Sequence, residues 1–422
     1  MKQRIKLLFA CSCVAAWSAG SLAQSFTWYA STEGNTWKTS TVKMSKKAAD
    51  AHVTVEENVA PIVEFKAWGA TFNELDWDAL GMLTRDEQDE ILKNVFSPEG
   101  DLRISRGRIS MNANDYARSW YSCDEVAGDL ELRYFNIDRD KQSIIPFIRA
   151  AQKYNPELTF WTSPWCPPSW MKITGDYPVL SSKFNHMPEK MNYILYGNVN
   201  DKVDPDEMKL VGRRGDKFPR QLATTDYFIQ DPRYLQAYAN YFCKFIDAYK
   251  EQGVNIDMVI YQNEAYSYTP YPGCAWTAEG TVRFNRDYLG PTLRQKHPEV
   301  KLYLGTFNTN RVDYVQKIAS DTKLQEYVSG MAFQWEGRES LPVLRKEHPE
   351  WNYMCSESEC GRGSFDWGAG EHTFELMNHY LGNGCNEYTF WNFILADNGE
   401  SPWGWKQNAL IRPPEPGIHK MA

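Results

Sequence analysis

The chain has 422 residues, of which 42% are hydrophobic and 24% charged, so it belongs to the ordinary globular class and can bury a sizeable core. Its net charge is −8 and it has no long run of Lys and Arg, which excludes the electrostatic signature of a nucleic-acid or anionic-membrane binder. Aromatic residues reach 14%, with 16 Trp. Most single Trp are interpreted as core residues, and only those near candidate motifs indicate a ligand surface.

The first 23 residues have the pattern of a signal peptide. Three basic residues precede an apolar run over Leu7–Trp17, and the small residues Ser21 and Ala23 suit cleavage before Gln24. This predicts a secreted or periplasmic protein; a lipoprotein cleaved at Cys11 is the weaker alternative. No later stretch reaches about 18 uninterrupted apolar residues, so we expect no membrane span.

Removal of that peptide leaves seven of the nine cysteines, an odd and scattered set that does not predict a disulfide framework. The sequence has no CxxC pair and no HExxH motif. We therefore expect no metal site and no cofactor.

From Ile62 to about residue 412, short apolar runs alternate with amphipathic segments, a pattern typical of a (β/α)8 TIM barrel in the α/β class. An open doubly wound sheet is the main alternative, but no glycine-rich phosphate loop follows the first run. The eight predicted strands are Ile62–Trp68, Arg103–Met111, Leu158–Ser163, Met258–Gln262, Lys301–Thr306, Val328–Gln334, Tyr353–Ser356 and Glu387–Trp391.

Two helices of this pattern have clear end signals. Thr84 and Glu87 form a capping box sequence, and Pro232 follows Asp231 at the start of a long amphipathic segment that Gly253 would end. A closed barrel then predicts an active site at the carboxyl ends of the strands.

Residues 24–61 are rich in Thr, Val and aromatics and predict short strands of a side β-domain. Two strands need a partner sheet, and the Pro-containing tail at 413–422 cannot supply one. We therefore expect a partial β-sandwich. The long segment from Met171 to Thr225 is expected to be an elaborated loop over the third strand.

Carboxylates follow two of the predicted strands. Glu264 comes after an apolar run and directly after Asn263, while Glu357 and Glu359 follow a later run. Retaining glycoside hydrolysis needs two carboxyl groups about 5 to 5.5 Å apart, one as acid/base and one as nucleophile. Taken singly, each segment is equally well explained by loop salt bridges, a helix cap or solvated acids, and strand alternation does not separate Glu357 from Glu359.

Seven segments in one order resemble the glucosylceramidase-like and endo-β-1,6-glucanase-like enzymes of glycoside hydrolase family 30. The resemblance spans Trp68 to Trp405. Its motifs are WGATFNE (68–74), RISMNANDYA (108–117), TSPWCPPSWMK (162–172), YQNEAY (261–266), FQWEG (333–337), CSESECG (355–361) and FWNFILADNGES (390–401).

The resemblance implies Glu264 as acid/base and Glu357, after Ser356, as nucleophile. It also implies a set of substrate-binding side chains around the two glutamates. These are Arg108, Asn263, Trp165, Trp335, Trp391, Asn73 and Gln334.

Three departures accompany the resemblance. Asn73 stands where the family pattern has an Asp on the pocket floor, Gln334 replaces a His, and the strands that complete a side β-sandwich are missing. The expected substrates are β-glucosides: glucosylceramide-like glycolipids or a β-1,6-glucan. The alternatives are a non-catalytic carbohydrate-binding barrel and an inactive truncated product.

Overall fold

The computed structural model describes residues 25–43, 60–172, 174–179, 182–183, 185, 226–267, 269–396 and 399–413. The chain divides into two units at Ile62. In the first, β1 (Ser25–Thr32) and β2 (Asn35–Lys43) form an antiparallel hairpin. This confirms strands in the N-terminal segment. The signal peptide, residues 44–59 of the predicted side β-domain, residues 186–225 of the predicted loop and residues 414–422 lie outside the described residues.

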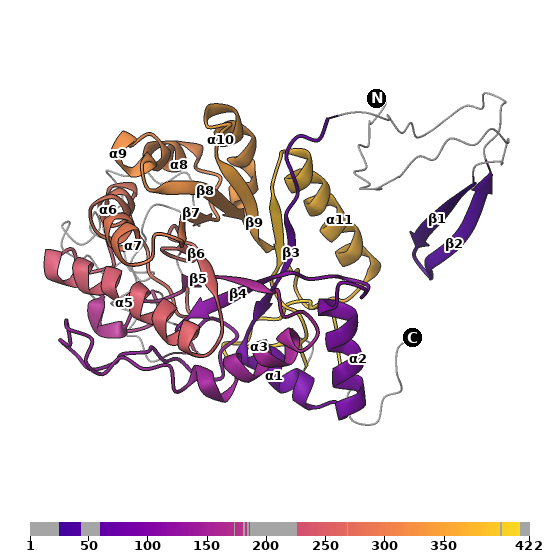
Figure 1. Cartoon of the computed structure of the whole chain (residues 1–422), viewed down its shortest axis with the longest axis horizontal. Helices are drawn as coiled ribbons and strands as arrows, with labels where there is room; N and C mark the ends of the chain where they lie inside the picture. The colour runs from indigo at the N-terminus through magenta and orange to yellow at the C-terminus, as the bar shows by residue number, and fades with distance from the viewer. Residues whose placement is uncertain are drawn as a thin grey trace. The chain divides into compact units, whose positions relative to one another are not determined.

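The second unit is a closed barrel of eight parallel strands, which confirms the predicted fold class. Around the barrel the order is β10-β3-β4-β5-β6-β7-β8-β9, so each strand pairs with its neighbours in the chain and the last closes on the first. Figure 1 labels β3 to β9 of this barrel among the helices. The strands are β3 (Ala67–Phe72), β4 (Arg106–Met111), β5 (Thr159–Pro164), β6 (Ile256–Ile260), β7 (Lys301–Phe307), β8 (Val328–Gln334), β9 (Asn352–Ser358) and β10 (Glu387–Phe390).

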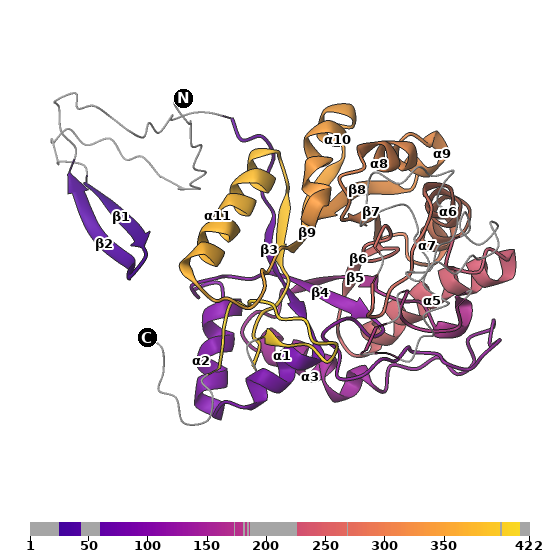
Figure 2. The same cartoon turned by 180° about the vertical axis from the view of Figure 1, so that it is seen from behind.

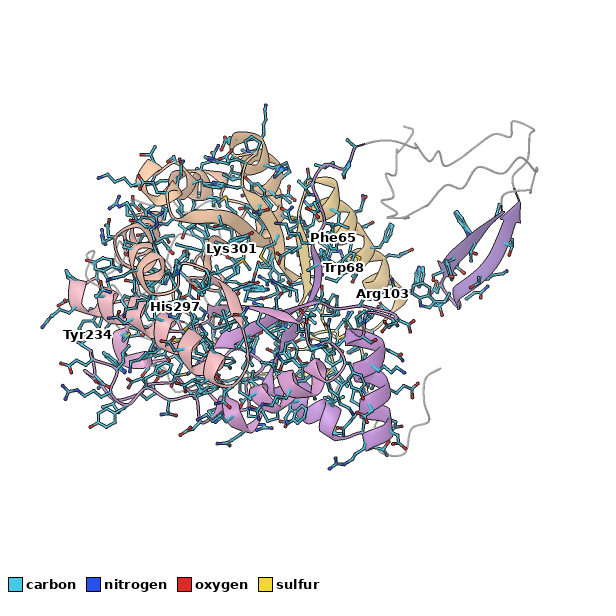
Figure 3. The ribbon with its side chains drawn as sticks, in the orientation of Figure 1. Phe65, Trp68, Arg103, Tyr234, His297 and Lys301 are labelled. Atoms are coloured by element: carbon cyan, nitrogen blue, oxygen red, sulfur yellow. The ribbon has the colours of Figure 1, made fainter. Side chains whose placement is uncertain are left out.

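Seven predicted strands agree with the structure to within three residues at either end. The first was wrong: the strand is Ala67–Phe72, not Ile62–Trp68. Ile62 is 49% exposed, so it does not belong to the barrel core. Phe65, also before the strand, packs its ring on Trp68 with centroids 4.7 Å apart (Figure 3). The true strand contains Gly69, where a Cβ atom would come within 2.7 Å of Thr389 Oγ1, so close strand packing selects a small residue there.

Helices cover the outside of the barrel, as Figure 2 shows from the opposite side. They are α1 (Glu74–Gly81), α2 (Arg85–Phe96), α3 (Ile144–Gln152), α5 (Pro232–Glu251), α6 (Ala278–Phe284), α7 (Gly290–Lys296), α8 (Val312–Ala319), α9 (Thr322–Gln325), α10 (Leu341–Glu347) and α11 (Trp367–Gly382). Shorter helical turns are η1 (Asp140–Gln142), η2 (Ser169–Met171), η4 (Asn285–Leu289) and η5 (Trp335–Glu339).

The predicted helix ends are confirmed. Thr84 and Glu87 cap α2 reciprocally, the Asp231 side chain accepts from the Arg233 N–H at the start of α5, and Gly253 follows α5 with φ +73°. Large apolar side chains of the strands and helices meet between the two layers and make the main core. Among the described residues, no helix is both long and apolar enough to cross a membrane.

Candidate active site

The carboxyl ends of the strands surround a cavity of about 240 Å³. Because all eight strands are parallel, the residues that follow each of them gather at this one rim. The cavity is lined by Asp115, Trp165, Asn263, Glu264, Ser267, Tyr271, Asn308, Trp335, Glu336, Glu357, Trp403, Trp405 and Gln407.

Glu357 lies near the end of β9 with its side chain 6% exposed. Arg108 Nη1 donates to Glu357 Oε2 at 2.6 Å, and Trp335 Nε1 donates to Glu357 Oε1 at 2.9 Å. Both carboxylate oxygens are therefore fixed by donors, one of them cationic. A carboxylate held in this way is presented in a single orientation.

Arg108 extends from β4 into a fully buried position beneath the cavity. Its guanidinium carbon lies 4.3 Å from the ring centroid of Trp165 and 5.1 Å from that of Trp391, and these two indoles stack with centroids 5.0 Å apart. Burial lowers the pKa of Arg108, and the charge of Glu357 opposes that shift. The aromatic faces and the carboxylate together compensate the cation for its lost water.

The side-chain amide of Asn263 is oriented by three donors. Its Oδ1 accepts from Arg108 Nη2 at 2.7 Å, from Thr306 Oγ1 at 3.0 Å and from Gln334 Nε2 at 3.2 Å. Because the oxygen must face these donors, the amide nitrogen is left toward the cavity that Asn263 lines. Asn263 can thus donate a hydrogen bond to a bound hydroxyl group.

Glu264 follows β6 and takes a left-handed backbone conformation with φ +49°, which is costly for a residue with a side chain and is found at functional sites. Gln334 Nε2 donates to its Oε1 at 3.2 Å, and the Tyr271 hydroxyl donates to its Oε2 at 3.3 Å. Burial first, and the nearby Glu357 charge second, raise the pKa of Glu264 to about 7. At neutral pH this carboxyl can therefore both give up and accept a proton.

Known proteins are similar to this chain in sequence and fold. Residues 65–183 and 228–410 match the TIM-barrel domain of glycosyl hydrolase family 30. The chain belongs to this family. Its relatives include a glucosylceramidase-like protein of Caenorhabditis elegans, 26% identical over 83% of this chain and 62% of that protein. The lysosomal acid glucosylceramidase of Mus musculus is 26% identical over 78% of this chain and 59% of the other.

Solved structures also share the fold. An endo-β-1,6-glucanase superposes with a TM-score of 0.64 at 23% identity, over 82% of this chain and 70% of the other. The chain spans about three fifths of the length of most of the curated relatives it matches, between 59% and 62% for four of them.

The structure brings five of the nine predicted site residues of this family 30 barrel to the cavity wall. They are Glu264, Glu357, Asn263, Trp165 and Trp335. Arg108 and Gln334 lie fully buried behind the wall and act on the cavity through the carboxylates they contact. Trp391 is also buried and stacks on Trp165 from behind.

Asn73 is buried but is not among the lining residues. Its amide lies between two others, donating to Asn392 Oδ1 at 3.5 Å and accepting from Asn114 Nδ2 at 2.6 Å. The adjacent Glu74 is turned away toward Arg139, with two contacts of 2.9 Å. A direct role of Asn73 in substrate binding stays a prediction.

Sequence reasoning missed Asp115. This buried carboxyl follows β4 and lines the cavity, its Oδ1 has no partner within the described part of the chain, and burial together with Glu357 raises its pKa well above the ordinary range. Its position directly after a strand was the same signal that identified Glu264. Tyr271, Trp403 and Trp405 were also missed, because they lie on loops far from any strand end.

Glu359, the competing carboxylate, faces elsewhere. Strand β9 ends at Ser358, so the alternation that would have aligned Glu359 with Glu357 stops before it. Its oxygens contact Arg338 Nη1 and His372 Nε2, the latter at 2.9 Å. Glu359 thus belongs to an ion-pair cluster outside the cavity.

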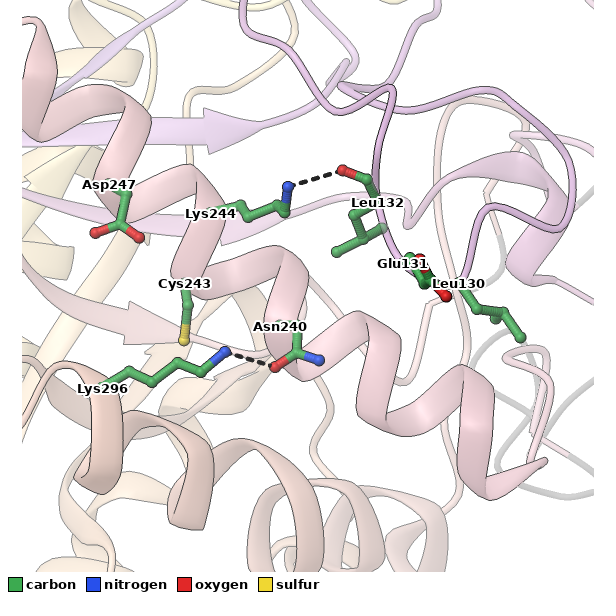
Figure 4. Close-up of a pocket in the computed structure, with 8 residues that line it drawn as sticks. All are labelled: Leu130, Glu131, Leu132, Asn240, Cys243, Lys244, Asp247 and Lys296. Atoms are coloured by element: carbon green, nitrogen blue, oxygen red, sulfur yellow. Dashed lines mark hydrogen bonds between the residues drawn. The ribbon is translucent and has the colours of Figure 1, made fainter.

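A second cavity of about 350 Å³ lies along α5 and shares no residue with the first (Figure 4). Lys244 Nζ donates across it to the Leu132 carbonyl and Lys296 Nζ to Asn240 Oδ1, so its amines are already engaged. Among the residues that the structure describes, no group of three or more His, Cys, Asp and Glu side chains is placed to bind a metal ion.

Proposed function

We propose that this family 30 chain is a retaining β-glycosidase that hydrolyses β-glucosidic bonds with Glu264 as acid/base and Glu357 as nucleophile. One observation carries the proposal: two buried glutamates line one cavity in opposite electrostatic settings. Glu357 is paired with the Arg108 cation at 2.6 Å, whereas the pKa of Glu264 is raised to about 7. One carboxylate fixed by a cation and one carboxyl able to exchange a proton are what the nucleophile and acid roles require.

In the first step, a Glu357 oxygen attacks the anomeric carbon and the bond from that carbon to the glycosidic oxygen breaks. Glu264 transfers its proton to the departing oxygen, so the leaving group departs as a neutral alcohol and the sugar becomes an ester of Glu357. Arg108 and Trp335 keep the attacking carboxylate aligned. Asn263 Nδ2 faces the sugar and supplies a donor to its hydroxyl next to the reacting carbon.

In the second step, Glu264 acts as a base. Once Glu357 is esterified its negative charge is gone, and with it one of the two main causes of the raised pKa of Glu264. Glu264 then takes a proton from water as the water oxygen attacks the anomeric carbon. The ester bond breaks, Glu357 leaves as a carboxylate, Glu264 is protonated again, and the sugar is released with β configuration.

The names of the relatives support two β-glucoside classes, glucosylceramide-like glycosides and β-1,6-glucan. The acidic chain and its predicted signal peptide support an exported enzyme acting on a neutral substrate. A non-catalytic barrel would have no need for the ion pair and the raised pKa that distinguish Glu357 from Glu264.

The test is hydrolysis of an aryl β-glucoside, β-1,6-glucan and glucosylceramide, with the anomer formed first recorded by proton NMR. We expect turnover of at least one substrate with the β-anomer appearing first. Glu357→Gln, prepared in the same way, lacks the proposed nucleophile and should lose this turnover. An α-anomer appearing first, or turnover that persists in Glu357→Gln, would refute the mechanism.

A further inference from the structure

Three aromatic side chains form a row at the cavity that the proposed chemistry does not use. Tyr271 and Trp403 have ring centroids 4.7 Å apart, and Trp403 stacks on Trp405 at 5.1 Å with 30° between the ring planes. All three line the cavity, and Trp405 is 41% exposed whereas Trp403 is 7% exposed. The row therefore runs from the partly buried Tyr271 through the buried Trp403 to Trp405, which faces solvent.

A tight hairpin over residues 399–407 holds the two indoles. The Ser401 N–H donates to the Trp405 carbonyl at 2.8 Å and the Gln407 N–H donates to the Gly399 carbonyl at 3.0 Å. Gly399 has φ +73°, and a Cβ atom there would lie 1.7 Å from the Gln407 carbonyl oxygen, so only glycine closes this loop. The rings are thus displayed on a constrained backbone, which reduces the entropy lost when a ligand binds.

The row begins at the acid. Tyr271 donates to Glu264 Oε2 at 3.3 Å, and in the proposed mechanism Glu264 delivers its proton to the leaving oxygen. The Asp115 carboxyl lies near Glu357, whose charge raises the pKa of Asp115, and Trp165 packs on the Arg108 guanidinium that holds Glu357. The group attached to the leaving oxygen therefore lies along Tyr271, Trp403 and Trp405.

The lining also indicates what that group is. Among the described residues, every apolar side chain of the cavity is a Trp or a Tyr; none is Leu, Ile, Val, Met or Phe. A lipid chain would gain most from aliphatic side chains, whereas a pyranose ring presents C–H faces to aromatic rings and hydroxyls to polar neighbours. Asn308, Glu336 and Ser267 supply those polar neighbours.

We propose that Tyr271, Trp403 and Trp405 form a leaving-group subsite for a second sugar ring, so that the substrate is a β-linked gluco-oligosaccharide or glucan and not a glycolipid. This inference rests on the proposed glycosidase function and adds its substrate class. Trp405, being the exposed end of the row, is the specificity-determining residue. Its ring stacks on the sugar that departs or on the one beyond it.

The experiment compares two substrates in the full chain. β-Glucosyl fluoride has a leaving group too small to reach the row, whereas a β-1,6-linked gluco-tetraose covers it. We expect Trp405→Ala to lower kcat/KM on the tetraose by about tenfold or more, the size of effect seen when a stacking Trp is truncated, and to leave the fluoride within about twofold. Trp405→Phe, which keeps a flat ring, should restore most of the loss.

Phe374→Ala is the matched control, since Phe374 is an exposed aromatic (56%) on α11 that does not line the cavity. It should change neither rate. If the wild-type protein is active but Trp405→Ala slows both substrates equally, or slows neither, the subsite is wrong and the glycosidase function still stands. Trp405→Ala slowing glucosylceramide but not the tetraose would overturn it in favour of a lipid. If the wild-type protein hydrolyses neither the tetraose nor β-glucosyl fluoride, both the glycosidase function and the subsite are wrong.

Discussion

The raised pKa of Glu264 predicts a pH-dependent change in the stability of the protein that can be measured without any substrate. Replacing it with Gln keeps the size of the side chain but removes its ionisation. The carboxyl is 9% exposed, and burial with the charge of Glu357 raises its pKa from an ordinary 4.5 to about 7. This rise in pKa, at about 1.4 kcal/mol per pH unit, means that folding favours the protonated form of Glu264 over the charged form by about 3 kcal/mol.

The direction in which stability changes with pH follows from the difference between the folded and unfolded pKa values of Glu264. The folded pKa lies above the unfolded one, so Glu264 contributes its full stability below pH 4.5 and loses it as the pH rises through about 7. Above pH 8 the folded protein contains a buried charge that Gln does not have. Relative to wild type, Glu264→Gln should therefore become more stable by up to about 3 kcal/mol between pH 4.5 and pH 8.5.

Thermal melting at several pH values measures this effect. For the unit from Val63 onward, about 360 residues, an unfolding entropy of about 2.1 cal/mol/K per residue converts 3 kcal/mol into a Tm difference of about 4 °C. The difference between the Tm of the variant and that of wild type should grow by this amount from pH 4.5 to pH 8.5. Any offset in Tm caused by the new amide itself is the same at every pH, so it cancels in this comparison.

Glu375→Gln on α11 is the matched control for replacing a glutamate with an amide, because Glu375 is exposed and does not line the cavity. If the Glu264→Gln difference is the same at every pH, the carboxyl is not held in its protonated form. If the difference falls with rising pH, the charged form is favoured in the folded protein and Glu264 cannot be the acid.

Three further predictions concern the same site. In wild type, kcat/KM should fall as the pH rises above about 7, because Glu264 loses the proton it must donate; a rate that stays level to pH 9 would contradict this. Glu359→Gln should keep most activity, since Glu359 contacts Arg338 and His372, whereas Glu357→Gln should lose about 10⁴-fold or more; steady-state rates on an aryl β-glucoside decide. Arg108→Met, which leaves Glu357 buried without its cation, should lower the free energy of unfolding by about 3–5 kcal/mol in denaturant melts.

The barrel could be predicted because its signals are local. A parallel strand buried on both faces reads as an apolar run, as in Val328–Gln334, and helix ends such as Thr84 have their own residues. The first strand was mislocated because the apolar residues before it pack at the barrel's entrance, while Gly69 and Ala70 inside it are chosen for close contact and carry little apolar signal.

Site residues divide in the same way. Glu264 and Glu357 stand after strands, and the parallel barrel brings such positions to one rim. Asp115, like Glu264, stands four residues past the end of its strand, but it lies in a polar segment with no apolar run beside it. Trp403 and Trp405 reach the cavity through a hairpin whose path depends on tertiary hydrogen bonds, which no local pattern encodes.

The assignment of acid and nucleophile is tested most directly by azide rescue. Glu264→Ala and Glu357→Ala each leave space for an azide ion, and an aryl β-glucoside with an activated leaving group needs little protonation. In Glu264→Ala the glycosyl ester still forms on Glu357, and azide attacks it without a general base.

The configuration of the glycosyl azide identifies which carboxyl was removed. We expect azide to restore turnover of Glu264→Ala and to give the β-glycosyl azide, after two inversions. In Glu357→Ala, azide replaces the nucleophile, so any product must be the α-azide. An α-azide from Glu264→Ala, or a β-azide from Glu357→Ala, would show that the two roles are reversed.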